Sequence, residues 1–276
     1  MKKNRMMRLA SVLLVAVLLT TCAISGTFAK YVTQRSYSES ARVAKFGIAI
    51  TADGSLFSTQ DPIEVSGTSI SVESSTAESV VAPGTSHNLE DESGDNYKCL
   101  KFGVTGKPEV DVKIEFLENA TTADIKMPYS TNYPDLTDEL GNKIDMTASE
   151  DYYPIKYTLK HRVYSVSGET ATPGEWSVVK DSSNNDLQDV KLSDIVDYLK
   201  GTTFEYERNT DLRTVFGDYV IEWEWAYHPD SPAWIDKADT FLGQLIAGVP
   251  GVEAPSGVTV VTTASLNLTI KVTQLD

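Results

Sequence analysis

The stretch Glu109-Val110-Asp111-Val112-Lys113-Ile114-Glu115-Phe116 decides the fold class, because apolar and charged residues alternate along it without interruption. Successive side chains of a strand point to opposite faces, so one face of this stretch can be buried while the other meets water. That pattern is typical of antiparallel sheets. Similar alternation recurs at residues 153–159, 219–227 and 260–272. The sequence therefore predicts an all-β protein built as an antiparallel β-sandwich.

Two short helices are expected between the strands, because apolar residues recur there at spacings of three and four. Ser193 is the predicted N-cap of the first helix, and Gly201 its stop. Asp236 and Gly248 take the same roles in the second. The apolar positions are Leu192, Ile195, Val196 and Leu199 in the first helix, and Ala238, Phe241, Leu242 and Leu245 in the second.

Turn signals and polar stretches complete the outline of one domain at residues 46–276. Asp53-Gly54 follows the first strand pattern and predicts a two-residue hairpin, because both positions tolerate positive φ. Residues 118–151 are polar and lack sustained periodicity, which is long for a loop inside a domain. We interpret them as an insertion at one end of the sandwich.

The first 29 residues have the form of a secretory signal peptide: a basic start, an apolar run at 9–19 and small residues before the cut. Cleavage is predicted between Ala29 and Lys30, with Thr27 and Ala29 as the small side chains that signal peptidase accommodates. A retained membrane anchor would need about twenty apolar residues, and the run is shorter. Lipidation of Cys22 is the other alternative. We expect export to the cell surface or matrix, without stable membrane insertion.

The mature chain of 247 residues would be strongly acidic, since the signal holds four of the 24 Lys and Arg residues and none of the 39 acids. Its net charge of −19 argues against nucleic-acid binding, which requires basic surfaces. The simplest interpretation of this charge is that it keeps the chains soluble by mutual repulsion. The alternative is that acidic loops of neighbouring chains bind Ca²⁺ between them. Cys99 is then the one remaining cysteine, and its strand-like surroundings predict a buried small hydrophobe.

Six short motifs follow one another in an order that resembles a known family. They are Gly-Thr-Phe-Ala-Lys-Tyr with Ala-Arg-Val-Ala-Lys-Phe-Gly within 26–47, Ala-Pro-Gly-Thr at 82–85, Thr-Gly-Lys-Pro-Glu-Val at 105–110, Trp-Glu-Trp at 223–225, Asp-Thr-Phe-Leu-Gly at 239–243 and Val-Thr-Gln at 272–274. In these motifs the chain resembles the TasA and camelysin family, secreted Gram-positive proteins with a SipW-type signal peptide. The resemblance implies a jelly-roll-like sandwich with the helices in crossing connections.

By the same resemblance, the expected function is structural: a subunit of biofilm matrix fibres. The expected mechanism is β-strand addition, in which a freed N-terminal segment pairs with a sheet edge of a like subunit or of a related matrix protein. We place the candidate donor at residues 30–45. Its candidate apolar anchors, together with the first residue after it, are Tyr31, Val32, Tyr37, Val43 and Phe46. Two alternatives remain: a disordered tail, or a first strand within the chain's own sheet at 43–50.

No catalytic residue, metal ligand set or cofactor site is predicted. The three histidines, His87, His161 and His228, share no local motif, and no His-Glu-x-x-His helix is present. Because camelysin is described as a metallopeptidase, a secreted metallopeptidase is an alternative function, and a monomeric surface adhesin is another. Glu222 and Glu224 are interpreted as a solvated strand face. The aromatic stripe of Trp223, Trp225 and Tyr227 is interpreted as core packing rather than a saccharide platform.

Overall fold

The computed structural model describes residues 46–57, 65–67, 69–76, 81–89, 99–117, 121–130, 150–226 and 233–275, together with Leu14. Contacts divide the chain into two units, Met1–Val43 and Ala44–Asp276. The strands and helices named below all belong to the second unit. Apart from Leu14, the predicted signal peptide, its cleavage residues and the candidate donor segment lie outside the described residues.

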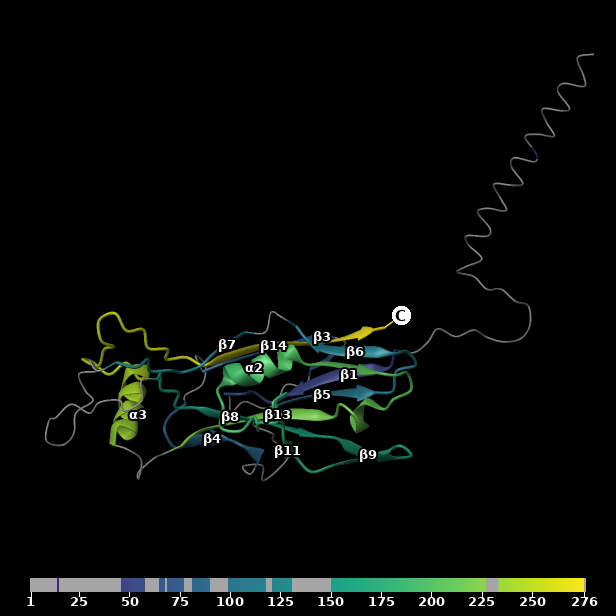
Figure 1. Ribbon diagram of the computed structural model, residues 1–276, viewed down its shortest axis with the longest axis horizontal. Helices are drawn as coiled ribbons and strands as arrows, with labels where there is room; N and C mark the ends of the chain where they lie inside the picture. The colour runs from purple at the N-terminus through teal and green to yellow at the C-terminus, as the bar shows by residue number, and fades with distance from the viewer. Residues whose placement is uncertain are drawn as a thin grey trace, which may run out of the picture. The chain divides into compact units, whose positions relative to one another are not determined.

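The larger sheet has the strand order β11-β8-β13-β5-β1-β2, with every pair antiparallel (Figure 1). Strand β13 is central: β8 pairs along one side of it, while β5 and β4 share the other side. The strands of this sheet are β1 (Ile48–Asp53), β2 (Val65–Gly67), β4 (Thr85–His87), β5 (Leu100–Gly106), β8 (Lys156–Arg162), β11 (Ser177–Val178) and β13 (Asp218–Trp225).

The smaller sheet has the order β12-β6-β14-β3, and β7 also pairs with β14. Its strands are β3 (Ser69–Ser75), β6 (Val112–Phe116), β7 (Thr121–Ala123), β12 (Thr203–Tyr206) and β14 (Ser265–Gln274). A separate hairpin joins β9 (Tyr164–Ser167) to β10 (Thr170–Pro173), and a short 3₁₀ turn, η2, covers Leu212–Thr214.

Two helices lie in connections that cross between the sheets, as the sequence pattern and the resemblance predicted. Helix α2 (Leu192–Gly201) joins β11 to β12, and helix α3 (Ala233–Ile246) joins β13 to β14. Gly248, with φ of 67°, follows the end of α3 and confirms the predicted stop. The fold is thus a sandwich of two antiparallel sheets with two short helices.

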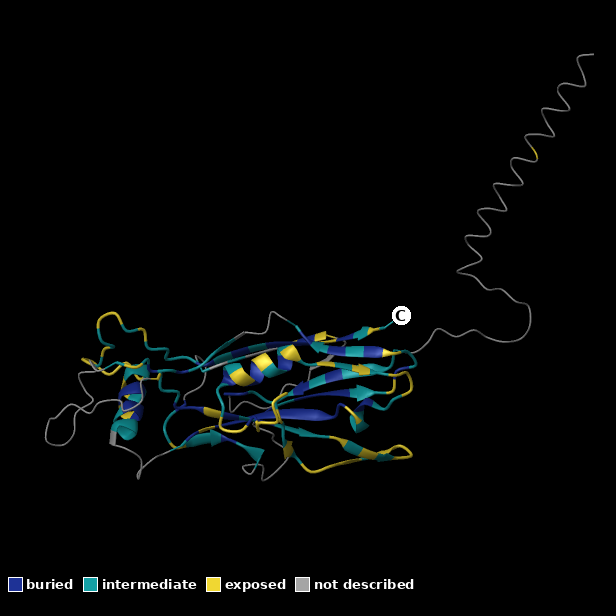
Figure 2. Cartoon of the chain, viewed as in Figure 1, coloured by how far each residue is buried: buried dark blue, intermediate teal, exposed yellow. Residues whose placement is uncertain are grey.

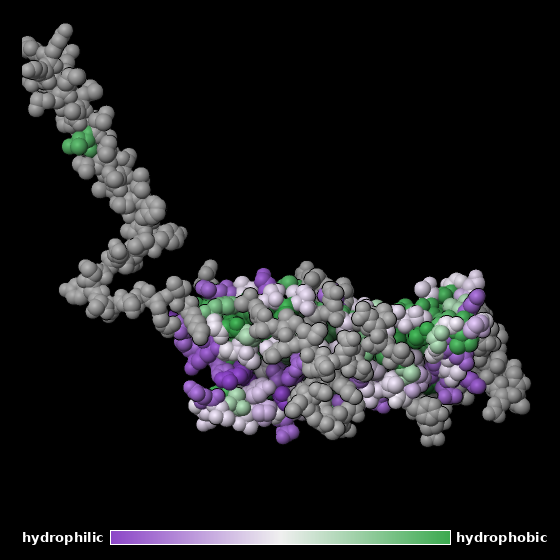
Figure 3. All heavy atoms as spheres, turned by 180° about the vertical axis from the view of Figure 1, so that it is seen from behind, coloured by the Kyte–Doolittle hydropathy of each residue, from purple (hydrophilic) through white to green (hydrophobic). Residues whose placement is uncertain are grey.

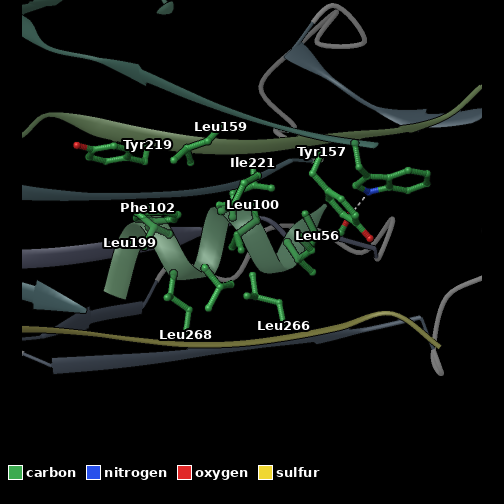
Figure 4. Close-up of a cluster of buried hydrophobic side chains, with 14 of the residues drawn as sticks. Leu56, Leu100, Phe102, Tyr157, Leu159, Leu199, Tyr219, Ile221, Leu266 and Leu268 are labelled. Atoms are coloured by element: carbon green, nitrogen blue, oxygen red, sulfur yellow. Dashed lines mark hydrogen bonds between the residues drawn. The ribbon is translucent and has the colours of Figure 1, made fainter. Parts of the chain in front are cut away.

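The core fills the space between the sheets, and α2 packs against it from the side. Figure 4 shows Leu199 of α2 among side chains of β13 and β8 from one sheet and β14 from the other. Figure 2 shows the exposed residues of α2 turned away from this core. The buried face of α2 consists of the four predicted residues, Leu192, Ile195, Val196 and Leu199.

Strand β6 confirms the alternation from which the fold class was predicted, because Val112, Ile114 and Phe116 are buried while the residues between them are not. Trp223 and Trp225 are likewise buried, which confirms core packing for the two described members of the aromatic stripe. Cys99 is fully buried, as expected.

Four local predictions were wrong. The turn after β1 is not a two-residue hairpin: the next strand among the described residues begins at Val65, and Leu56 and Phe57 enter the core instead. Part of the polar stretch at 118–151 belongs to the sandwich, since it forms β7 and contributes Ile125 and Met127 to the core. Helix α2 begins at Leu192, so Ser193 is not its N-cap. Helix α3 begins at Ala233, so Asp236 lies inside its first turn and is not its N-cap.

The helix is capped by a distant residue. Asp124, which follows β7, accepts hydrogen bonds from the backbone N–H groups of Leu192 at 3.1 Å and Ser193 at 3.4 Å. A carboxylate at this position bonds amides that no helical carbonyl can reach. Burial raises the pKa of Asp124, while these two amide bonds act in the opposite direction.

Candidate functional site

The predicted assembly residues can be placed only in part. Tyr31, Val32, Tyr37 and Val43 lie outside the described residues, as do Thr27, Ala29 and Lys30. Phe46 is half-buried and packs against the core of its own chain, just before β1. Residues 48–53 form an inner strand of the larger sheet, so any donor segment must end before Phe46.

The long outer edge of the smaller sheet is formed by β3. Its seven residues pair with β14 on one side, from Ser69 opposite Lys271 to Ser75 opposite Ser265. No described strand pairs with its other side. Proteins usually blunt such edges with lysine, proline or a bulge. The sequence of β3, Ser-Ile-Ser-Val-Glu-Ser-Ser, contains no lysine or proline and a single charge, Glu73.

The other sheet edges in the described part of the chain are shorter. Strand β12 has four residues, β2 has three and β11 has two. A short edge offers few backbone groups to an incoming strand, so β3 is the edge best suited to strand addition.

The chain enters the sandwich at the end where β3 begins. Ile50 in β1 pairs with Gly67, the last residue of β2, and β3 starts two residues later at Ser69. Strand β1 therefore begins close to the end of the sandwich at which β3 starts.

A buried carboxylate of helix α3 forms hydrogen bonds with the larger sheet and with the residue Tyr152. Asp239 accepts hydrogen bonds from Trp225 Nε1 at 2.9 Å and from the Tyr152 hydroxyl at 2.7 Å. The Tyr152 ring also packs edge-on against Trp234, with 5.4 Å between centroids. Seen from behind, apolar side chains gather at this end of the sandwich (Figure 3). Two of the sequence motifs, Trp-Glu-Trp and Asp-Thr-Phe-Leu-Gly, thus meet through Trp225 and Asp239.

We expect Asp239→Ala to lower the free energy of unfolding by about 2–3 kcal/mol, because the indole N–H of Trp225 would stay buried without this acceptor. Asp239→Asn keeps a carbonyl oxygen at the same place and should cost less. Urea denaturation of both variants measures the difference. Equal stability of the two variants would show that the hydrogen bonds do not hold the helix.

A second buried polar cluster lies at the opposite end of β13. Asp218 pairs with Arg162 at 3.1 Å and accepts a hydrogen bond from the Tyr164 hydroxyl. The Arg162 guanidinium lies over the Trp176 ring, 4.3 Å from its centroid. Burial, followed by the bond to Asp218, raises the pKa of Tyr164 to about 12, so its hydroxyl stays protonated and donates. This cluster ties the β9–β10 hairpin to the larger sheet.

The prediction of a solvated face for the two glutamates was wrong for Glu222. Glu224 is exposed, but Glu222 is 7 % exposed. It accepts a hydrogen bond from the Leu89 backbone at 2.8 Å and pairs with Lys160 at 2.7 Å. The backbone at Leu89, two residues after β4, therefore lies against this side of β13. The carboxylate is thus paired and serves the packing of this part of the chain.

The described histidines lie apart and contact aromatic rings. His87 lies against Trp223 and His161 against Tyr219, at 5.1 Å and 4.5 Å between centroids. His228 lies outside the described residues. Within the described ranges, no group of three or more His, Cys, Asp or Glu side chains is arranged to hold a metal ion.

Comparison with known proteins gives no match among protein-family models, curated proteins or solved structures. Among the described residues, no helix has the length and apolar character needed to cross a membrane. Sequence inspection missed Tyr152, Arg162 and Asp218 as contact residues. Their partners are 54 to 87 positions away, and no local pattern marks them.

Proposed function

We propose that this chain is a secreted structural subunit that assembles into fibres by β-strand addition. Residues 30–45 of one copy would add to the outer edge of β3 in the next copy. The observation that carries the proposal is the seven-residue edge of β3, which lacks the residues that normally discourage pairing. Backbone hydrogen bonds would give affinity, and alternate side chains of the donor would set the register.

Charge supports the pairing of these two parts. Residues 30–45 contain Lys30, Arg35, Arg42 and Lys45 against a single acid, Glu39, a net charge of +3. The remaining 46–276 contain 16 basic and 38 acidic residues, a net charge of −22. A basic donor is attracted to an acidic acceptor domain, while the acidic domains repel one another laterally. A contact between different surfaces of successive copies does not close on itself, so it propagates into a filament.

Signal-peptide cleavage would control this assembly, because the donor is tethered to the membrane until the cut after Ala29. The motif resemblance to the TasA and camelysin family points to the same function, with matrix fibres as the product.

Two purified forms test the proposal, one beginning at Lys30 and one at Phe46. The shorter form keeps Phe46, which packs against the core, and all of β1. We expect filaments from the longer form alone, observed by electron microscopy and light scattering. High salt should slow their growth, because it screens the charge attraction.

If both forms stay monomeric at high concentration, with and without Ca²⁺, self-assembly is overturned. The alternatives then have distinct signatures. A metallopeptidase would bind zinc and cleave casein in a chelator-sensitive manner, and an adhesin would bind a glycan or a host protein as a monomer.

A further inference from the structure

A shallow depression of about 480 Å³ lies where the start of β8 meets the N-terminus of α2. Its lining combines two carboxylates, two ammonium groups and two phenols. The lining residues are Glu150, Asp151, Tyr152, Tyr153, Lys156 and Lys191.

The ammonium groups of two lysines lie near the Tyr153 ring. The Lys191 ammonium lies 4.3 Å from the centroid of the Tyr153 ring, and that of Lys126 lies 6.0 Å from it. Lys126 is neutralised by Asp151 at 2.8 Å. Lys156 and Lys191, in contrast, form no ion pair with any other described residue. Within the described residues, two ammonium groups therefore line one depression without a direct ion pair, on a chain that is acidic overall.

The acidic side of the depression is held in place. Asp151 accepts the backbone N–H of Tyr129 at 3.2 Å as well as pairing with Lys126. The hydrogen bond to Lys126 lowers the pKa of Asp151, and the Tyr129 amide and the charge of Lys191 add to this effect. The carboxylate thus stays ionised and can accept hydrogen bonds.

We propose that this depression binds an acidic saccharide that contains a uronic acid. The sugar carboxylate would lie between Lys156 and Lys191, where charge-assisted hydrogen bonds are strong. Its hydroxyls would donate to Glu150 and Asp151, and its ring would contact Tyr153. The same two carboxylates would repel a phosphate dianion, which favours a singly charged sugar acid. The proposal stands whether or not the chain forms fibres.

Binding of galacturonic-acid oligosaccharides to the mature chain, measured by calorimetry, tests the proposal. Neutral dextran and poly-L-glutamate serve as comparison probes. We expect the oligogalacturonate to bind at least about tenfold more tightly than either, because it alone offers both a carboxylate and a sugar ring. Equal binding of dextran would show that the lysines do not select an acid. Equal binding of poly-L-glutamate would show attraction by charge alone. Either result would overturn the proposal.

Variants locate the site. The double variant Lys156→Gln with Lys191→Gln should weaken oligogalacturonate binding by about tenfold or more, since charged hydrogen bonds are lost. Lys180→Gln with Lys271→Gln removes the same charge from exposed positions elsewhere and should leave binding unchanged. Tyr153→Ala should also weaken binding, with circular dichroism confirming the fold. If both lysine pairs reduce binding equally, or if no variant changes it, the depression is not the site.

Discussion

Replacing Arg162 by methionine should lower the free energy of unfolding by about 3–5 kcal/mol, the usual effect of removing one partner from a buried ion pair. The side chains of Arg162 and Asp218 are only 11 % and 8 % exposed. Without the guanidinium, the Asp218 carboxylate keeps the Tyr164 hydroxyl but loses its counter-charge in a region that water barely reaches. Trp176 also loses the cation on its ring. The midpoint temperature of thermal unfolding of the purified variant should fall by roughly 10 °C for a domain of this size.

The Lys180→Met variant is the matched control. Lys180 and Asp186 form an ion pair at 2.5 Å, but their side chains are 52 % and 53 % exposed. Exposed pairs contribute little, so this variant should be much less affected. Adding Asp218→Asn to Arg162→Met should recover part of the lost stability, because it removes the unpaired buried charge. A similar loss for Arg162→Met and Lys180→Met, or no recovery in the double variant, would contradict this account.

The parts of the fold that sequence could predict are those with a local periodic signal. The alternation along Val112, Ile114 and Phe116 and the helical spacing of α2 both depend on residues a few positions apart. The two-sheet class follows from many such strands. The pairing order of the strands depends on contacts across the whole chain, and no local pattern encodes it.

Two of the wrong local predictions concern positions whose hydrogen-bond partner is distant in sequence. Ser193 was expected to cap α2, but Asp124, 69 positions earlier, bonds its amide. As an N-cap, Ser193 would accept from amides two or three residues further along, whereas Asp124 accepts from the first amides of the helix. A carboxylate also interacts favourably with the positive end of the helix dipole. Glu222 was expected in water because strands of antiparallel sheets commonly have one wet face. Leu89, whose backbone N–H donates a hydrogen bond to Glu222, is 133 positions away in sequence.

The candidate edge was also beyond the sequence pattern. The strand at residues 69–75 is mostly polar, and nothing in its sequence marks it as an edge strand. Its place at the edge of the sheet follows only from its pairing with β14. The charge contrast between residues 30–45 and the rest of the chain could be counted from the sequence. Its relevance to assembly depends on β3, which has one side without a partner among the described strands.

Lysines placed on β3 should abolish filament formation while leaving the folded subunit intact. Ser69 and Ser71 are exposed positions on this edge strand. In the double variant Ser69→Lys with Ser71→Lys, two cations would face a donor segment that itself carries a net charge of +3. Lysine is a common device against edge pairing, and here repulsion of the basic donor adds to it. Ser71 Oγ lies 2.9 Å from Thr269 Oγ1, so loss of this hydrogen bond should lower the free energy of unfolding by about 1 kcal/mol, which leaves the subunit folded.

The matched control places the same change of two charges on the opposite edge of the same sheet. Thr203→Lys with Glu205→Gln alters two exposed positions of β12 and should still give filaments. Electron microscopy compares the two double variants at equal concentration and salt. Loss of filaments in the β3 variant alone locates the acceptor at β3, because net charge and sheet are the same in both. Filaments in both variants would exclude β3 as the acceptor, and loss in both would attribute the effect to overall charge rather than to a particular edge.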